Sequence, residues 1–181
     1  MTLKRDVGDL LASLPPEEKA ELLATLLMEM EWPIPDVVFQ ALMQRTVSVP
    51  IELAVVNEEG QVLMTPRKDA FFEWLHIPGT VLRDNETVQQ AMERLLAKEV
   101  HGTVKGMQSL GWVELTRGPL PNQNPFRHEI SLLHACYVDG KRVSGEFFSP
   151  GELPDNTLPH HKMLIPLIGK RMWQRRRGIH W

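Results

Sequence analysis

The stretch Pro78–Gly102, PGTVLRDNETVQQAMERLLAKEVHG, decides the fold, because it joins a Pro-Gly turn to a capped amphipathic helix. Glycine in the turn has no Cβ, so the backbone there can come close to a ligand. Glu86 places a carboxylate at the positive end of the helix dipole, and His101-Gly102 is expected to end the helix with a left-handed glycine. These features together suggest a metal–phosphate site. Candidate N-cap residues are Asp84, Asn85 and Thr87, and the apolar face is Val88, Ala91, Met92, Leu95 and Leu96.

The same stretch resembles the signature of the Nudix hydrolases, which runs G, five residues, E, seven residues, R-E-U-x-E-E-x-G-U. With Thr80 at the first glycine, Glu86 falls on the first glutamate, Arg94 on the arginine and Glu99 on the last glutamate. The resemblance implies that Glu99 is a principal ligand of Mg²⁺ or Mn²⁺. It also implies that Glu86 and Arg94 brace the loop and the helix.

The chain departs from the signature at four positions. Leu95 and Lys98 occupy the other two glutamate positions, Thr80 replaces the glycine, and Gly102 comes one residue late. The pattern is most similar to the GDP-mannose mannosyl hydrolase branch, which also begins the second half with E-R-L and keeps a single glutamate. That branch uses one metal and a histidine base. Its Gln-His pair corresponds here to Lys141-Arg142, so its mechanism does not carry over.

The resemblance covers roughly Phe39 to Arg171 and includes Gly145–Pro154, which is similar to the family's W-F-x-x-x-E-L-P segment. It implies an α+β fold, an α/β/α sandwich in which helices flank a mixed β-sheet. We expect three parts in the chain. They are an N-terminal helical hairpin over residues 1–46, a Nudix domain over residues 47–171 and a basic tail over residues 172–181.

The N-terminal region has the pattern of amphipathic helices. Ser13 is a candidate N-cap ahead of Pro15-Pro16, and Trp32–Pro35 separates this helix from a second one that Asp36 caps. The apolar stripe predicts either packing on the other domain or a homodimer interface. A DNA-reading role is disfavoured because neither helix has a basic face. The stripe consists of Leu22, Leu23, Leu26, Leu27 and Met30.

Alternating and apolar runs predict the strands of the sheet. Residues 47–56 and 61–65 form a predicted hairpin across the turn Asn57–Gly60. Further strands are predicted at Gly111–Leu115 and Glu129–Val138. Leu158–Lys170 predicts one final helix or two, interrupted at Pro166 and Gly169.

Several side chains outside the signature are candidates for the site. Arg67, at the end of the second predicted strand, suits a phosphate, although it is equally well a solvated charge beside Lys68. Trp74 could stack on a base or sugar, or belong to the core. His128 is a candidate general base, against the simpler role of a strand histidine. Glu129 could supply a second metal carboxylate.

Two classes of function follow. In a hydrolase of a nucleoside diphosphate linked to another group, such as a nucleotide sugar, Glu99 and the Thr80 carbonyl would hold Mg²⁺ or Mn²⁺ while Arg67 contacts the phosphates. In the alternative, Lys98 neutralises a bound phosphate without metal, and the protein is a nucleotide sensor or a scaffold. The degenerate signature predicts weak or altered activity in the first class.

Composition limits the remaining possibilities. The 181 residues, 43% of them apolar, suit one domain with an extension. A net charge of −3 disfavours a dedicated nucleic-acid or membrane-surface protein. The single Cys136 excludes an internal disulfide and, with no secretory pattern at the N-terminus, predicts a cytoplasmic protein.

Overall fold

The computed structural model describes residues 3–31, 33–68, 73–101, 103–120, 123–139 and 143–177. The chain divides into two compact units, residues 1–41 and residues 42–181. The predicted turn residues Gly140, Lys141 and Arg142 and the last four residues lie outside the described ranges.

The first part of the chain forms three helices, α1 (Leu3–Ser13), α2 (Pro16–Glu29) and α3 (Asp36–Met43), where two were expected. Ser13 does not cap α2, as the sequence suggested. It is the last residue of α1, and its hydroxyl donates to the Leu10 carbonyl at 2.7 Å. Pro15 occupies the N-cap of α2 without a side-chain bond, so proline geometry and the acidic first turn start this helix.

The apolar stripe of α2 remains exposed within the described residues. Leu22, Leu23 and Leu26 expose 39%, 58% and 45% of their surface, and no residue of α2 is buried.

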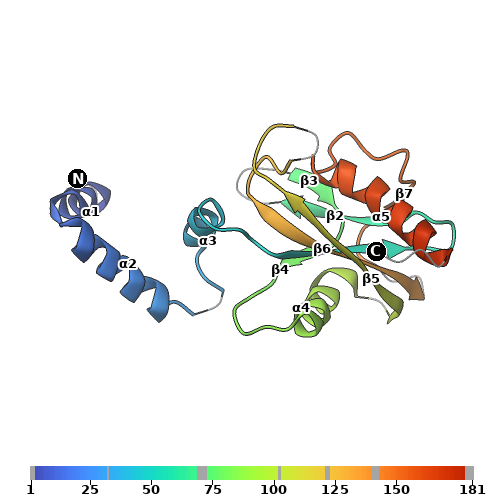
Figure 1. The fold of residues 1–181 in the computed structure, drawn as a ribbon, viewed down its shortest axis with the longest axis horizontal. Helices are drawn as coiled ribbons and strands as arrows, with labels where there is room; N and C mark the ends of the chain where they lie inside the picture. The colour runs from blue at the N-terminus through green and yellow to red at the C-terminus, as the bar shows by residue number, and fades with distance from the viewer. Residues whose placement is uncertain are drawn as a thin grey trace. The chain divides into compact units, whose positions relative to one another are not determined.

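The second unit is built on a mixed sheet, seen in Figure 1, with the order β3-β2-β1-β6-β5. The central pair, β1 and β6, is parallel, while β2, β4 and β5 pair antiparallel with their neighbours. β4 adds to β1, and β7 adds to β2. The strands are β1 (Pro50–Val56), β2 (Val62–Lys68), β3 (Glu73–His76), β4 (Gly79–Val81), β5 (Thr103–Leu115), β6 (Glu129–Asp139) and β7 (Glu146–Phe148).

Helices cover both faces of this sheet, so the predicted α/β/α sandwich is confirmed (Figure 1). Helix α4 (Val88–Leu95) packs on the face of β1 that carries Ile51, Leu53 and Val55. Helix α5 (His161–Arg176) packs on the opposite face, against Ala54 and Val56. Alternation along β1 therefore serves two cores, which explains why this strand is almost continuously apolar.

Two features differ from the sequence prediction. Of the one or two final helices expected, the structure has one, α5, which is not interrupted at Pro166 or Gly169. Pro166 and Lys162 both lie on the exposed side of α5, where water can bond the Lys162 carbonyl that proline leaves without a helical donor. β5 begins eight residues before the predicted Gly111. Gly106 and Gly111 adopt positive φ angles of 63° and 86° and sit where the β5–β6 register shifts, so they act as bulges inside one long strand.

Two further observations concern the basic C-terminal residues and the possibility of a membrane-spanning helix. The basic residues Arg175 and Arg176 form the last turn of α5, inside the segment expected to be a tail. Among the described helices, none has the length and apolar character needed to cross a membrane.

Candidate functional site

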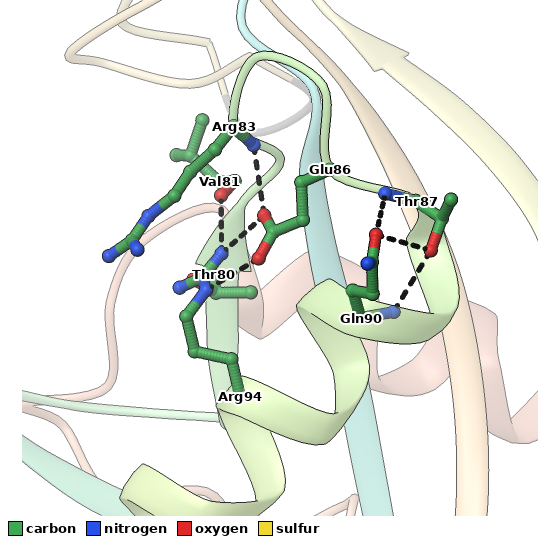
Figure 2. A network of polar contacts seen from close by, with 7 residues as sticks. All are labelled: Thr80, Val81, Arg83, Glu86, Thr87, Gln90 and Arg94. Atoms are coloured by element: carbon green, nitrogen blue, oxygen red, sulfur yellow. Dashed lines mark hydrogen bonds and ion pairs between the residues drawn. The ribbon is translucent and has the colours of Figure 1, made fainter. Parts of the chain in front are cut away.

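The loop before α4 is tied to the helix by Arg94, as Figure 2 shows. The Arg94 guanidinium donates to both carboxylate oxygens of Glu86 at 2.7 Å, to Thr80 Oγ1 at 2.6 Å and to the Val81 carbonyl at 3.1 Å. Glu86 also accepts from the Arg83 backbone N–H at 3.0 Å. The bond from Arg94 is the main reason that the pKa of Glu86 falls to about 2. This brace fixes β4 relative to the helix.

Of the three candidate N-cap residues, Thr87 caps α4 (Figure 2). Its Oγ1 accepts from the Gln90 backbone N–H at 3.2 Å, and the Gln90 side chain accepts from the Thr87 N–H at 2.8 Å. This reciprocal pair is a capping box. The helix start is thus fixed independently of the Arg94 brace.

The extra residue before Gly102 is absorbed by a π-helical turn, Leu96–Val100, that continues α4. The His101 N–H donates to the Leu96 carbonyl five residues earlier, at 3.1 Å. His101 is the C-cap residue and takes the left-handed conformation, with φ 54°, while the expected cap residue Gly102 lies outside the described residues. Single π turns are frequent at functional sites, and this turn carries both Lys98 and Glu99.

Glu99 projects from the π turn towards β4. Its carboxylate accepts a hydrogen bond from the Gly79 backbone N–H. Its Oε2 is buried and has no hydrogen-bond partner among the described residues. Burial raises the pKa of Glu99 above the ordinary glutamate value, against the lowering effect of Lys98 and of the Gly79 bond. Glu99 is thus a desolvated carboxylate with one acceptor atom unused.

Glu52 is a second buried carboxylate that the sequence analysis missed. It lies in β1, is 4% exposed, and pairs in register with Gly79 of β4. Its Oε2 is buried without a hydrogen-bond partner among the described residues. Burial is the largest cause that raises its pKa well above the ordinary value, and the charge of Glu129 adds to it. A lone carboxylate in an otherwise apolar strand was the available signal.

Three buried histidines lie beside Glu52 on the α5 face of the sheet. His161 Nδ1 accepts from the Ile77 backbone N–H at 3.1 Å, which places the neutral ring's proton on Nε2. His160 packs edge-on against His161, with ring centroids 4.5 Å apart. The ring centroid of His76 lies 6.0 Å from that of His161. His76 Nε2 contacts Thr65 Oγ1 at 3.2 Å.

Burial keeps these rings neutral. It lowers the pKa of His76 to about 4, helped by the charge of Arg67, and that of His160 to about 3, helped by Arg127. The pKa of His161 lies well below the ordinary value for the same reason. The group therefore adds no positive charge near Glu52 at neutral pH.

Acid should destabilise the protein through these histidines. Since the folded pKa of His76 lies below the unfolded value, the unfolded state binds more protons between pH 6.5 and pH 4, and stability falls as pH falls. His76 alone should cost about 2 kcal/mol at pH 5 relative to pH 7. Urea denaturation at both pH values measures the loss. His76→Gln, which can keep the contact with Thr65, should reduce it by about that amount.

The pKa values of Glu52 and Glu99 are raised, so these two groups increase the stability of the folded protein as the pH falls and oppose the effect of the histidines. The comparison with His76→Gln is therefore needed to isolate the contribution of His76. An equal loss in both proteins would contradict the assignment to His76.

The structure brings most of the sequence-derived candidates together. The charge of Arg67 contributes to the pKa shifts of Glu52, Glu99 and the three histidines, so its half-buried side chain belongs to this group. Trp74 is opposite Arg67 in the β2–β3 register. Lys98 is exposed beside Glu99, and Thr80 lies in β4 next to Gly79, with its hydroxyl bound to Arg94.

Glu129 and His128 have other partners. The Glu129 carboxylate is fully buried and accepts from Asn124 Nδ2 at 2.8 Å, Arg127 Nε at 3.0 Å and Ser131 Oγ at 2.8 Å. These bonds hold the preceding loop to β6 and occupy the carboxylate. His128 Nε2 lies 3.0 Å from Glu114 Oε1 of β5. Neighbouring residues in extended chain point to opposite sides, so the structure does not bring His128 to Glu52 and Glu99.

Among the described residues, no three His, Cys, Asp or Glu side chains converge closely enough to hold a metal ion. The site instead offers two unpaired buried carboxylate oxygens, of Glu52 and Glu99, on either side of Gly79. Arg67 and Lys98 supply nearby positive charge.

Comparison with known proteins identifies the fold and the family. The model of the NUDIX domain matches residues 46–175. No match was found among curated proteins. Solved structures with the same fold include a possible asymmetric diadenosine tetraphosphate (Ap4A) hydrolase from Jonesia denitrificans, which is 18% identical with a TM-score of 0.53, over 70% of this chain and 97% of its own.

Two other structures agree in fold. The MutT Nudix hydrolase of Burkholderia pseudomallei is 16% identical with a TM-score of 0.54, over 67% of this chain and 97% of its own. The Nudix domain of Shewanella oneidensis NrtR, solved with ADP-ribose, is 14% identical with a TM-score of 0.51, over 84% of this chain and 97% of its own. These matches give the GDP-mannose mannosyl hydrolase branch no specific support. Because the domain match spans well over half of the chain and the fold agrees with it, the chain belongs to the Nudix family.

Proposed function

We propose that this Nudix protein is a divalent-metal-dependent hydrolase of a nucleoside diphosphate linked to a second group. One observation carries the proposal. The brace of Arg94 and Glu86 and the π turn hold Glu99 against the Gly79 N–H, while Glu99 Oε2 stays buried without a partner among the described residues. Burying a carboxylate in this way is costly unless it serves a cation or a proton.

The residues present fit a hard divalent cation. Mg²⁺ and Mn²⁺ prefer oxygen ligands, and Mg²⁺ sites commonly use one or two carboxylates together with substrate phosphates and water. Glu99 would hold the ion with the Thr80 carbonyl. When bound, the ion offsets charge on the diphosphate and lowers the pKa of a bound water. Arg67 would contact the phosphates through its planar guanidinium, and Trp74 beside it in the β2–β3 register would contact the base or sugar.

The relatives favour this substrate class. One similar structure is described as a possible Ap4A hydrolase, and another was solved with ADP-ribose. Both molecules contain nucleoside phosphates linked to a second group. We therefore propose ADP-ribose, dinucleoside polyphosphates and nucleotide sugars as the substrates to test.

A second candidate, a Nudix-fold sensor that binds nucleotide without turnover, is favoured by two residues of the helix. Leu95 is 1% exposed in the core and offers no ligand atom. Lys98 carries a positive charge that lowers the pKa of neighbouring Glu99. A cation at this position could neutralise a phosphate in place of a metal.

The experiment is a calorimetric titration of the full chain with Mn²⁺, alone and with ADP, paired with turnover assays on the three substrate groups. Glu99→Gln should keep the fold and weaken Mn²⁺ binding. Turnover should fall roughly 100-fold or more, since even an outer-shell partner of a metal is worth roughly 10- to 100-fold. Glu114→Gln is the matched control, because Glu114 is a half-exposed carboxylate paired with His128.

Three outcomes separate the candidates. Mn²⁺ binding that tightens with ADP and is lost in Glu99→Gln supports the hydrolase. ADP binding that is indifferent to Mn²⁺ and to Glu99→Gln supports the sensor and overturns the hydrolase. Equal losses in Glu99→Gln and Glu114→Gln would show that the effect is general and does not belong to this site.

A further inference from the structure

We infer that Glu52 of β1 is a second carboxylate ligand of the divalent cation and compensates for the carboxylates missing from the π turn and α4. The inference rests on the proposed function and deepens it, because it assigns the site a ligand from a strand outside the signature.

The position of Glu52 is the first support. Its neighbours Ile51 and Leu53 are fully buried, and Glu52 itself is 4% exposed. A buried carboxylate that lacks a partner is costly in free energy, so such groups are retained where something neutralises them. His161 Nε2 lies 3.6 Å from Glu52 Oε2, which is too long for a hydrogen bond. Among the residues that the structure describes, Oε2 therefore has no hydrogen-bond donor.

Gly79 connects Glu52 to Glu99. A methyl group at Gly79 would lie 2.8 Å from Glu52 Oε2 and 3.3 Å from the Ile51 carbonyl oxygen, so only glycine lets the carboxylate come this close. The backbone N–H of the same glycine donates to Glu99. One residue thus contacts both carboxylates, and each carboxylate keeps one buried oxygen without a partner among the described residues. A cation held by both would supply the missing partner for each.

The helix cannot supply this second carboxylate. At the signature's other two glutamate positions, Leu95 is packed in the core and Lys98 is exposed and cationic. Glu99 alone would leave the ion with one carboxylate. Glu52 raises the number to two, which is the usual protein contribution to a Mg²⁺ site that also binds substrate phosphates.

His161 lies beside Glu52 without a hydrogen bond to it. Its Nδ1 accepts from the Ile77 N–H, so its proton is on Nε2, the atom nearest Glu52. The ring packs edge-on against His160. Burial keeps the ring neutral at pH 7, because it holds the pKa of His161 well below the ordinary value, so His161 adds no positive charge that competes with a cation.

The test is Mn²⁺ binding to the full chain, measured by calorimetry and by the Mn²⁺-induced rise in Tm, in wild type, Glu52→Gln, Glu99→Gln and the control Glu114→Gln. Glu52→Gln should weaken Mn²⁺ binding about tenfold or more and reduce the rise in Tm. Its Tm without metal should equal or exceed that of wild type, because a neutral amide is cheaper to bury than an unpaired carboxylate. Glu114→Gln should match wild type in both measurements.

The outcomes separate this inference from the proposed function. If Glu99→Gln loses Mn²⁺ binding while Glu52→Gln keeps it, the role of Glu52 is overturned and the hydrolase proposal stands. If wild type binds no Mn²⁺ with or without ADP, both fail. Should Glu52→Gln not fold, Glu52→Asp provides the test, since it keeps the charge but withdraws the carboxylate by one methylene. Unchanged Mn²⁺ affinity in Glu52→Asp would then overturn the inference.

Discussion

Replacing Arg94 with methionine is expected to lower the free energy of unfolding by about 3 kcal/mol. The substitution keeps an unbranched apolar stem but removes the guanidinium and its four hydrogen bonds, two of them to Glu86 and the others to Thr80 and Val81. Glu86 would keep only its backbone bond from Arg83. Urea denaturation of wild type and Arg94→Met measures the loss.

A double-mutant cycle isolates the ion pair from the loss of the other bonds. We expect the coupling energy of Arg94→Met with Glu86→Gln to be about 1.5 kcal/mol or more. The chain offers a control in Lys68 and Glu73, which lie 3.7 Å apart with about three quarters of each side chain exposed. Exposed pairs are worth about 0–1 kcal/mol. A coupling no larger than that of Lys68 and Glu73 would mean that Arg94 is an ordinary surface cation and not a brace.

Gly145→Ala is expected to lower the free energy of unfolding by about 4 kcal/mol. Gly145 adopts φ 121°, which side-chain-bearing residues rarely reach, and an added Cβ would lie 2.3 Å from the Met64 carbonyl oxygen. That oxygen belongs to the backbone of β2, where Met64 pairs with Glu146 of β7, so it cannot move without disturbing the sheet. Thermal and urea denaturation measure the effect.

Two other glycines separate conformational strain from the clash. Gly60 has φ 78° but nothing within 4 Å of an added Cβ, so Gly60→Ala should cost only about 1–2 kcal/mol. Gly151 has neither a positive φ nor a close neighbour, and Gly151→Ala should be nearly neutral. If Gly145→Ala loses no more stability than Gly60→Ala, the contact with Met64 relaxes cheaply and our explanation is wrong.

The fold was predictable because its signals are local. The apolar runs of β1 and β6 and the spacing of α4 are each contained in about a dozen residues. The boundaries that failed depended on tertiary context. Pro166 and Gly111 normally interrupt elements, but the first lies on an exposed face of α5 and the second forms a bulge in β5. Nothing in their immediate neighbours distinguishes these outcomes.

The candidate site was predictable where the signature covers it and not elsewhere. Glu86 and Arg94, which the resemblance gave a bracing role, form an ion pair, and Glu99 lies beside Gly79. Glu52 was missed because alternation along an apolar strand gives no reason to place a charge in the interior. His161 and Glu52 are more than 100 residues apart in the sequence, and they come together only because α5 begins against the face of the sheet that carries Glu52. The proximity of such residues is a property of topology, not of local pattern.

The parallel pairing of β1 with β6 has a consequence for synthesis of the chain. Ser48, just before β1, bonds to His128, which lies 80 residues later. At about 5 to 20 residues per second, β1 would wait about 4 to 16 s on the ribosome for its central neighbour. During that time β1 can pair only with β2 and β4, and its other edge stays open to wrong partners. A nascent chain that stops short of Glu129 would therefore depend on chaperones or rapid degradation.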